Sequence, residues 1–344
     1  MASFGGIDLG GTKIQAAIVD EDSNVLGSAR RPTPTSGGPE DVAREMGRAL
    51  RDAALAAETE PAGLAGVGVG SPGTVRGGDV TSARNLPGWE GTYALGGELE
   101  RRLGCPVALG NDVRVATVAE FELGAGRLYK SLLGVFWGTG VGGGLILDGK
   151  PWVGRGAAGE IGHVVVELDG AKCTCGRRGC MEAYAGRAAM EAHAQYLHEE
   201  KGRRTDLFKL MRERGRTRVT SGVWARALDQ GDKLAVHMID RAVNALGAGV
   251  ASVQNVLDVE GIVIGGGLGV RLGHPYAKRI ADAMLPHLFV DHDPPHVHVA
   301  ALGDLGGAIG ASLLVREQEP DGATAGAAGA GGSAPGAGAG ARRS

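Results

Sequence analysis

One pattern constrains the fold of this chain more than any other: two β-type runs joined by a glycine-rich loop, found near the start of the chain and again in its middle. The first copy is FGGIDLGGTKIQAAIV (4–19) and the second is LLGVFWGTGVGGGLIL (132–147). Further along, each copy is followed by a strand that closes on a glycine turn, GVGVGSPG (66–73) and GIVIGGGLG (261–269). The repetition predicts two copies of one β-hairpin-plus-helix unit, and hence an α/β protein with two domains.

The glycine loops indicate phosphate binding. Without side chains in the way, backbone N–H groups can converge on phosphate oxygens. The spacing is neither G-x-G-x-x-G in a βαβ unit nor G-x-x-x-x-G-K-[ST], so neither a dinucleotide fold nor a P-loop is predicted. We expect a phosphate ligand to lie between the two units.

Composition sets the broad class of the protein. The 344 residues are 43% hydrophobic and 22% charged, with a formal net charge of -3. Such a chain is long enough for two domains, and it favours neither a nucleic-acid partner nor a membrane partner. The start, MASFGGIDLGG, lacks the features of a secretion signal, so we expect a cytoplasmic protein. From about Glu317 the Gly/Ala-rich tail has no apolar periodicity, and residues 317–344 are expected to be disordered.

Three of the four cysteines lie in the stretch CTCGRRGC (173–180). Glycines between Cys173, Cys175 and Cys180 allow the sulfurs to point inward, as in a metal knuckle, and a closed structural zinc site needs a fourth protein ligand. His163 is the nearest histidine upstream, before an apparent strand VVVEL (164–168), whereas His193 and His198 are the alternatives. Buried thiols or a redox pair would also explain the cluster, although redox pairs usually have C-x-x-C spacing.

A second set of polar residues suits a polyol substrate. Asn111 and Asp112 end a short strand, Glu160 and His163 precede the knuckle, and Glu182 follows it. Carboxylates and amides bind adjacent hydroxyls in pairs. Phosphoryl transfer to a hydroxyl also needs a base and a cation that neutralises phosphate charge.

Asp112 suits the role of the base, and Asp8 suits the role of a ligand to the metal cation. Asp112 could equally be a turn or N-cap residue before the helix VRVATVAEFELG, because Asn and Asp favour both roles. Asp8 lies within the strand GIDLG, where aspartate is rare, so its charge needs a partner.

These residues together resemble the ROK family (repressors, open reading frames, sugar kinases) of the actin-like ATPase and hexokinase superfamily. The resemblance covers about residues 5–312. It is carried by GIDLGGTK, WGTGVGGG and IVIGGGLG, and most specifically by EIGH followed by CTCGRRGCME.

The resemblance implies a ribonuclease H-like α/β fold with two domains around a central cleft. A small N-terminal domain would cover residues 1–113, with a C-terminal helix at about 304–316 packing back on it. A large domain with the zinc knuckle would cover residues 114–303.

Site residues follow by matching position. Asp112 is implied as the catalytic base for the sugar 6-hydroxyl. Nucleotide contacts are implied for Asp8, Gly10, Gly11, Thr12, Lys13, Thr139, Gly140, Gly265, Gly266 and Gly267. Sugar contacts are implied for Gly73, Asn85, Asn111, Asp112, Glu160, His163 and Glu182. The zinc ligands would be His163, Cys173, Cys175 and Cys180.

The implied function is phosphorylation of a hexose by ATP with Mg²⁺, most simply of glucose to glucose 6-phosphate, beside a structural Zn²⁺. Kinases for N-acetylglucosamine, N-acetylmannosamine or fructose share these motifs, and polyphosphate is an alternative donor. A sugar sensor without catalysis is the competing class. Only seven residues precede Asp8, which leaves no room for the helix-turn-helix of the family's repressors. A homodimer or homotetramer is implied.

Two other segments have simpler interpretations. The basic stretch KGRRTDLFKLMRERGRTR (201–218) resembles a nucleic-acid patch but contains acidic residues, and a solvated helix is favoured. His292, His296 and His298 could form a second metal site, although a proline-bounded loop leading into a strand is favoured.

Overall fold

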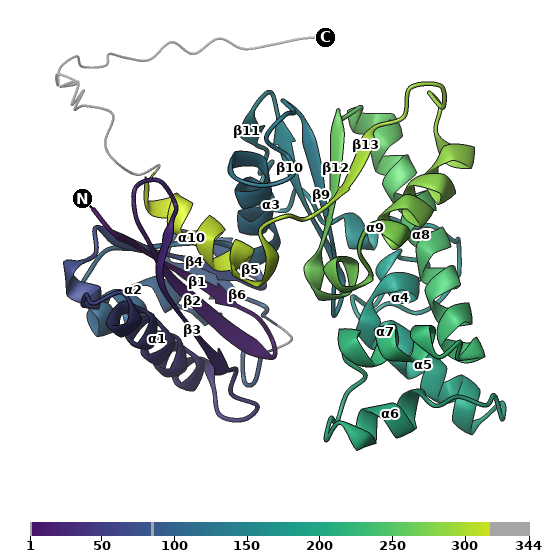
Figure 1. Cartoon of the computed structure of the whole chain (residues 1–344), viewed down its shortest axis with the longest axis horizontal. Helices are drawn as coiled ribbons and strands as arrows, with labels where there is room; N and C mark the ends of the chain where they lie inside the picture. Colours follow the sequence, from purple (N-terminus) through teal and green to yellow (C-terminus); the bar gives the residue numbers. More distant parts are fainter. Residues whose placement is uncertain (1, 84–85, 317–344) are drawn as a thin grey trace, which may run out of the picture.

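The structure is a computed structural model that describes residues 2–83 and 86–316. Two α/β domains lie side by side, each built on a five-stranded mixed sheet (Figure 1). The first sheet has the order β3-β2-β1-β4-β8. Its strands are β1 (Phe4–Leu9), β2 (Lys13–Val19), β3 (Val25–Pro32), β4 (Gly66–Ser71) and β8 (Val107–Asn111).

The second sheet has the order β11-β10-β9-β12-β13. Its strands are β9 (Leu132–Trp137), β10 (Val141–Leu147), β11 (Lys150–Pro151), β12 (Gly261–Gly265) and β13 (His296–Val299). In both sheets the first strand pairs antiparallel with the second and parallel with the fourth, and the fourth pairs parallel with the fifth. The predicted repetition of one unit is therefore confirmed.

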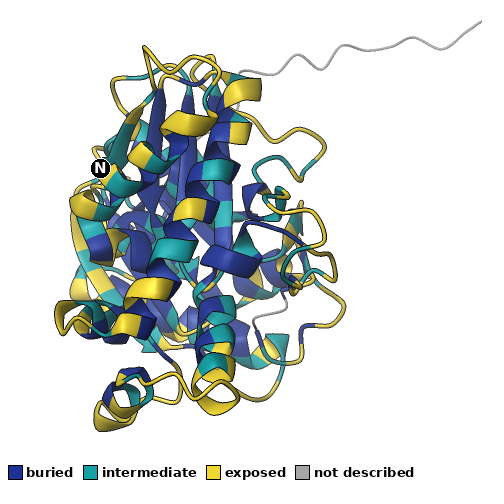
Figure 2. Ribbon diagram, turned by 90° about the vertical axis from the view of Figure 1, so that its right-hand side faces the viewer, coloured by how far each residue is buried: buried dark blue, intermediate teal, exposed yellow. Residues whose placement is uncertain are grey.

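Amphipathic helices cover one face of each sheet. On α1 (Pro39–Ala56) the predicted apolar face is fully buried, including Val42, Met46 and Leu50. Together with α2 (Leu95–Leu103) it closes the core of the first domain. In the second domain α8 (Lys233–Leu257) and α9 (Gly266–Met284) close the larger core. Figure 2 shows the strands and the inner helix faces in dark blue beneath exposed outer helix faces.

The opposite faces are covered by helices that cross between the domains. Helix α3 (Asp112–Glu122) follows the first sheet but packs on β9 and β10 of the second. Helix α10 (Gly306–Arg316) follows the second sheet but packs on β1 and β4 of the first (Figure 1). The two helices also contact each other.

Glycines within the strands allow these two helices to approach closely. A β-carbon at Gly6 would lie 1.8 Å from the carbonyl oxygen of Ala308 on α10. A β-carbon at Gly144 would lie 2.1 Å from Oγ1 of Thr117 on α3. Much of the glycine in the β-type runs therefore serves helix-on-sheet contact, beside the loops.

Two insertions complete the domains. The first is a small sheet of β5 (Thr74–Arg76), β6 (Asp79–Thr81) and β7 (Thr92–Tyr93). The second lies between β11 and β12 and contains the helices α4 (Glu182–Ala185), α5 (Arg187–Glu199), α6 (Leu207–Glu213) and α7 (Ser221–Asp229). The short 3₁₀ helices are η1 (Pro61–Gly63), η2 (Ile161–His163), η3 (Leu285–His287) and η4 (Gly303–Leu305).

One predicted element is wrong. The stretch VVVEL (164–168) is not a strand and forms only an isolated antiparallel bridge, between Val165 and Cys180. Val165 and Leu168 are exposed, so the stretch lacks the second apolar layer that a buried strand needs. The bridge nevertheless brings the segment after His163 beside the cysteines.

Other segments agree with their interpretations or lie outside the described part. A loop leads into β13 at His296, and the described residues contain no metal-binding group built on the three C-terminal histidines. The predicted tail, 317–344, lies outside the described residues, as does Asn85. Among residues 2–83 and 86–316, no helix combines the length and the apolar character needed to cross a bilayer.

Candidate active site

A cavity of about 1990 Å³ lies between the two domains. It is bordered by the β1–β2 hairpin loop, by the β9–β10 hairpin loop, and by the carboxyl ends of β4 and β8. The fourth border is the insertion that follows β11. In both sheets the hairpin loop lies at the edge where the parallel strands end, so the glycine loops of both units open onto one space.

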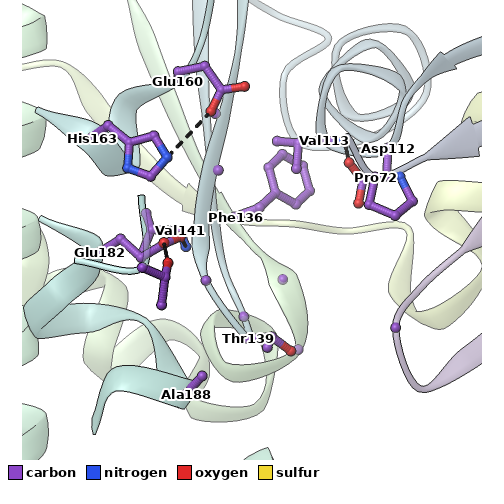
Figure 3. A pocket seen from close by; sticks show the side chains of 18 of the residues that line it. Pro72, Asp112, Val113, Phe136, Thr139, Val141, Glu160, His163, Glu182 and Ala188 are labelled. Carbon is purple, nitrogen blue, oxygen red and sulfur yellow. Dashed lines mark hydrogen bonds and ion pairs between the residues drawn. The ribbon is translucent and has the colours of Figure 1, made fainter. Parts of the chain in front are cut away.

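Asp112 faces this cavity (Figure 3). It is the first residue of α3, and the side chain of Asn111 caps the helix by accepting the backbone N–H of Arg114 at 3.1 Å. Asp112 is therefore not the N-cap residue, and its carboxylate accepts the backbone N–H of Val113 at 2.9 Å. Burial, and after it the negative charge of Asp8, raise the pKa of Asp112 from its ordinary 3.8 to about 7.

Asp8 lies on β1, close to Asp112. Burial raises the pKa of Asp8 to about 6, against the lowering effect of the positive charge of Lys13. Lys13 forms an ion pair with Asp304 at 3.3 Å. Among the described residues no hydrogen-bond donor reaches the Asp8 carboxylate. Mg²⁺ prefers oxygen ligands, so a carboxylate whose oxygens accept no hydrogen bond fits this ion.

Across the cavity from Asp112, three polar side chains come from the β11–β12 insertion. Glu160 precedes η2 and His163 ends it, with His163 Nε2 at 4.0 Å from Glu160 Oε2 (Figure 3). Glu182 begins α4, and its Oε2 accepts the backbone N–H of Val141 at 2.9 Å. Its Oε1 accepts the hydroxyl of Thr174 at 3.3 Å. Glu182 thus links the β9–β10 hairpin to the cysteine loop.

The β9–β10 loop is braced by the start of α5. The Thr139 hydroxyl accepts a hydrogen bond from Arg187 Nη2 at 2.9 Å, and its carbonyl oxygen accepts the backbone N–H of Ala188 at 3.0 Å. On the other side of the loop β12 ends, and α9 begins at Gly266 with φ +77°. Only glycine takes this conformation readily, and a β-carbon there would also lie 2.6 Å from the Trp137 carbonyl oxygen.

Four side chains form a candidate metal site beside the cavity. The ligand atoms of His163, Cys173, Cys175 and Cys180 all lie within 4.8 Å of one another. Cys173 Sγ is 3.8 Å from His163 Nδ1, and Cys175 Sγ is 3.7 Å from Cys180 Sγ. Tetrahedral zinc with Zn–S bonds of about 2.3 Å separates its sulfur ligands by about 3.8 Å, so these residues fit zinc.

The structure brings most of the predicted site residues to the cavity. Three described ones do not line it: Thr12, Gly265 and Cys180. Cys180 is fully buried beneath the cysteine loop, whereas Thr12 is exposed beside the cavity. Of the alternative zinc ligands, His193 lines the cavity but is not in the cysteine group, and His198 bonds the carbonyl oxygen of Arg203.

Two cavity-side contacts were not predicted. Arg187 holds Thr139, and Arg114 donates to the carbonyl oxygen of Gly156 at 3.3 Å. Burial lowers the pKa of both guanidinium groups. A lone arginine in a helix has no motif around it, so the sequence offers no signal for either residue.

Comparisons with known proteins agree with this geometry. The model of the ROK family matches residues 4–318. A glucokinase of Thermotoga maritima is 32% identical over 321 residues, covering 91% of this chain and 97% of the relative. An N-acetyl-D-glucosamine kinase of Escherichia coli is 31% identical, covering 90% and 98%.

Among solved structures, a ROK family glucokinase from Streptomyces griseus in complex with glucose and AMPPNP superposes with a TM-score of 0.79. It is 30% identical, and the match covers 92% of this chain and 100% of that one. The chain described here belongs to the ROK family.

Proposed function

We propose that this chain is a hexose kinase that transfers the terminal phosphoryl group of ATP to the 6-hydroxyl of glucose. One observation carries the proposal: a cavity-facing carboxylate, Asp112, lies between two glycine hairpins and opposite Glu160, His163 and Glu182. This arrangement can hold a polyol and a phosphate chain together.

Asp112 is the proposed general base. Its pKa of about 7 leaves it ionised at slightly alkaline pH while keeping it basic enough to accept a proton from an alcohol. As the 6-hydroxyl oxygen attacks the terminal phosphorus, its proton passes to the Asp112 carboxylate and the bond to the leaving diphosphate breaks.

The donor phosphates are proposed to bind at the two hairpins. Backbone N–H groups around Gly10, Gly11, Thr139 and Gly140 would contact phosphate oxygens, with Lys13 as a nearby cation. Thr12 would contribute from its exposed position, and the turn of Gly265, Gly266 and Gly267 would face the nucleoside. Asp8 would hold Mg²⁺, which when bound neutralises phosphate charge.

The sugar ring is proposed to bind between Asp112 and the β11–β12 insertion. Asn111, Glu160, His163 and Glu182 would bind its hydroxyls, beside Gly73, whose carbonyl oxygen accepts Asn111 Nδ2 at 3.4 Å. Asn85 stays a prediction outside the described residues. Because the zinc site is closed by four protein ligands, we propose that zinc fixes the loop between Glu160 and Glu182 and takes no direct part in catalysis.

The wider assignments are also proposals. We propose a ribonuclease H-like fold with domains at 1–113 and 114–303, since α10 returns to the first sheet. Residence in the cytoplasm, a homodimer or homotetramer, and polyphosphate as an alternative donor stay predictions.

A second candidate substrate class is an N-acetylhexosamine. The Escherichia coli N-acetyl-D-glucosamine kinase is 31% identical to this chain and the Thermotoga glucokinase 32%, so similarity hardly separates the two sugars. ADP release should therefore be measured with glucose, fructose, N-acetylglucosamine and N-acetylmannosamine. We expect the highest kcat/KM with glucose. Sugar binding without turnover on any of the four would instead identify a sensor.

A further inference from the structure

The segment between α5 and α7 carries the highest density of positive charge that the described structure presents. It holds eight exposed cations and two carboxylates, a net charge of +6, and since the whole chain has -3 the remainder has -9. We name this surface the basic ridge. Its cations are Lys201, Arg203, Arg204, Lys209, Arg212, Arg214, Arg216 and Arg218.

The basic ridge has a fixed backbone. Leu207 and Leu210 are buried and anchor α6 in the core of the second domain. The carboxylate of Asp232 accepts the Thr205 hydroxyl at 2.9 Å and the backbone N–H of Asp206 at 2.7 Å. The positive charges therefore stand on an ordered scaffold.

Most of these charges lack a carboxylate partner. Within the described residues, only Lys209 and Arg218 have a carboxylate within 4.0 Å, from Glu213 and Glu191. A solvated surface usually carries both signs in similar numbers, whereas the basic ridge has eight cations and two carboxylates. The unpaired positive charge can therefore act on an anion in solution.

Both ends of the basic ridge reach the cavity. Arg218 lines it directly, and Lys201 lies 5.5 Å from the ring centre of Tyr196, which also lines it. Helix α5 connects this region to the β9–β10 loop, because its first residues bond to Gly138 and Thr139. A 13-residue helix is about 20 Å long, so the basic ridge begins about 20 Å from the proposed phosphate site.

We propose that the basic ridge attracts and docks the phosphate chain of the donor before it enters the cavity, an inference that rests on the proposed function. A positive field beside a cleft raises the local concentration of anions and their rate of entry. Glucose is neutral and gains nothing from this field. The shared ligand chemistry is a chain of phosphates, carried by a nucleoside triphosphate or by inorganic polyphosphate.

The first test compares the two substrates of one enzyme. The triple variant Arg212→Gln, Arg214→Gln, Arg216→Gln removes three charges that form no ion pair within the described chain. At low salt we expect KM for ATP to rise about tenfold while KM for glucose keeps its value, and we expect added salt to remove the difference. The matched control, Arg30→Gln, Arg127→Gln, Lys150→Gln, removes three exposed cations that do not line the cavity, and should leave both constants unchanged.

The proposal would be overturned if the ridge variant and the control changed KM for ATP equally. It would also be overturned if the ridge variant changed KM for ATP and KM for glucose in parallel. Competition by inorganic polyphosphates of increasing length against ATP separates the two donor sources. Inhibition that strengthens with length and weakens in the ridge variant shows that the surface accepts inorganic chains. Inhibition that is independent of length restricts the docking to nucleoside triphosphates.

A second measurement does not depend on turnover. Calorimetric titration with inorganic tripolyphosphate, without sugar, should give an affinity about tenfold weaker in the ridge variant than in the control. An unchanged affinity for tripolyphosphate would contradict the docking proposal even if the enzyme phosphorylates glucose. Weakened affinity in a chain that phosphorylates no sugar would leave the docking surface standing and remove only the kinase assignment.

Discussion

The two five-stranded sheets have the same strand order but differ at the helix that follows the fifth strand. After β8, α3 begins with Asp112, which faces the cavity. After β13, the equivalent helix α10 begins with Gly306 and Gly307, and a β-carbon at Gly307 would lie 2.7 Å from Cγ of Asp8. The helix after the first sheet supplies the carboxylate of Asp112, whereas the helix after the second sheet leaves room for the carboxylate of Asp8.

The two domains also differ in the segments inserted between their strands. Between β4 and β8 the first domain has the small sheet β5-β6-β7 and the helix α2. The second carries η2, the cysteine loop and α4 to α7 between β11 and β12. The comparison teaches that the repeated scaffold places two glycine loops at one cavity, whereas the side chains proposed to act on the acceptor come from parts that the two copies do not share.

The strongest way to break this comparison is to remove the carboxylate that only the first copy has. Asp112→Asn should lower kcat by about 10²- to 10⁴-fold, because the amide cannot accept the hydroxyl proton. Glucose affinity, measured by calorimetry, should change less than about threefold, since the amide keeps the size of the side chain. Near-normal turnover would show that another group is the base.

The next largest effect concerns the loop that only the second copy has. Cys180→Ser should abolish binding of about one zinc per chain and lower Tm by roughly 5–10 °C. Glucose KM should also rise, because the loop carries Thr174 and adjoins Glu182. Cys105→Ser, at a buried cysteine in the first domain, is the control and should keep the zinc measured by elemental analysis.

A smaller effect is expected when the space beside the Asp8 carboxylate is filled. Gly307→Ala should push the Asp8 carboxylate aside and raise KM for ATP about tenfold, with little change in glucose KM. Gly97→Ala on α2 is the control, because no atom lies within 4 Å of the added β-carbon. Unchanged ATP kinetics in Gly307→Ala would argue that Asp8 does not take part in donor binding.

The smallest effect is on stability as a function of pH. Asp112 has a pKa of about 7 in the folded chain against its ordinary 3.8, so its contribution to stability is complete below about pH 4 and is lost as the pH rises through 7. Asp112→Asn should therefore raise Tm by about 2–4 °C at pH 8 and by much less at pH 5. Asn111→Asp, which adds charge at the helix cap, should not reproduce this pattern.

Activity should follow the same ionisation in the opposite direction. Because the base must be deprotonated, kcat/KM for glucose should fall as the pH drops below about 7. A pH profile that is flat between 5 and 8 would separate the stability effect from any catalytic role of Asp112.

Much of the fold could be predicted because its signals are local. The hairpins follow from β-type runs around GG and GTG, and the apolar face of α1 follows from helical spacing. The metal cluster follows from three cysteines spaced by glycines. In each case the residues that decide the structure are close together in the chain.

The remainder depends on partners that are distant in the sequence. The crossing of α3 and α10 is set by where Gly6 and Gly144 admit a helix, which no periodicity reveals. The bond from Glu182 to Val141, and that from Arg187 to Thr139, each join two separate elements. VVVEL was wrongly predicted as a strand because its apolar run signals β-structure although Val165 and Leu168 face solvent.

The exchange of α3 and α10 also bears on how the chain can be divided. One face of each sheet is covered by a helix that belongs, in sequence, to the other half of the chain. A break near Arg127 would therefore leave the first sheet without α10 and the second without α3. Neither fragment should be stable alone, yet the two should reassemble when co-expressed. Because α3 and α10 contact each other, the same reciprocity places a junction between the two domains where these helices meet.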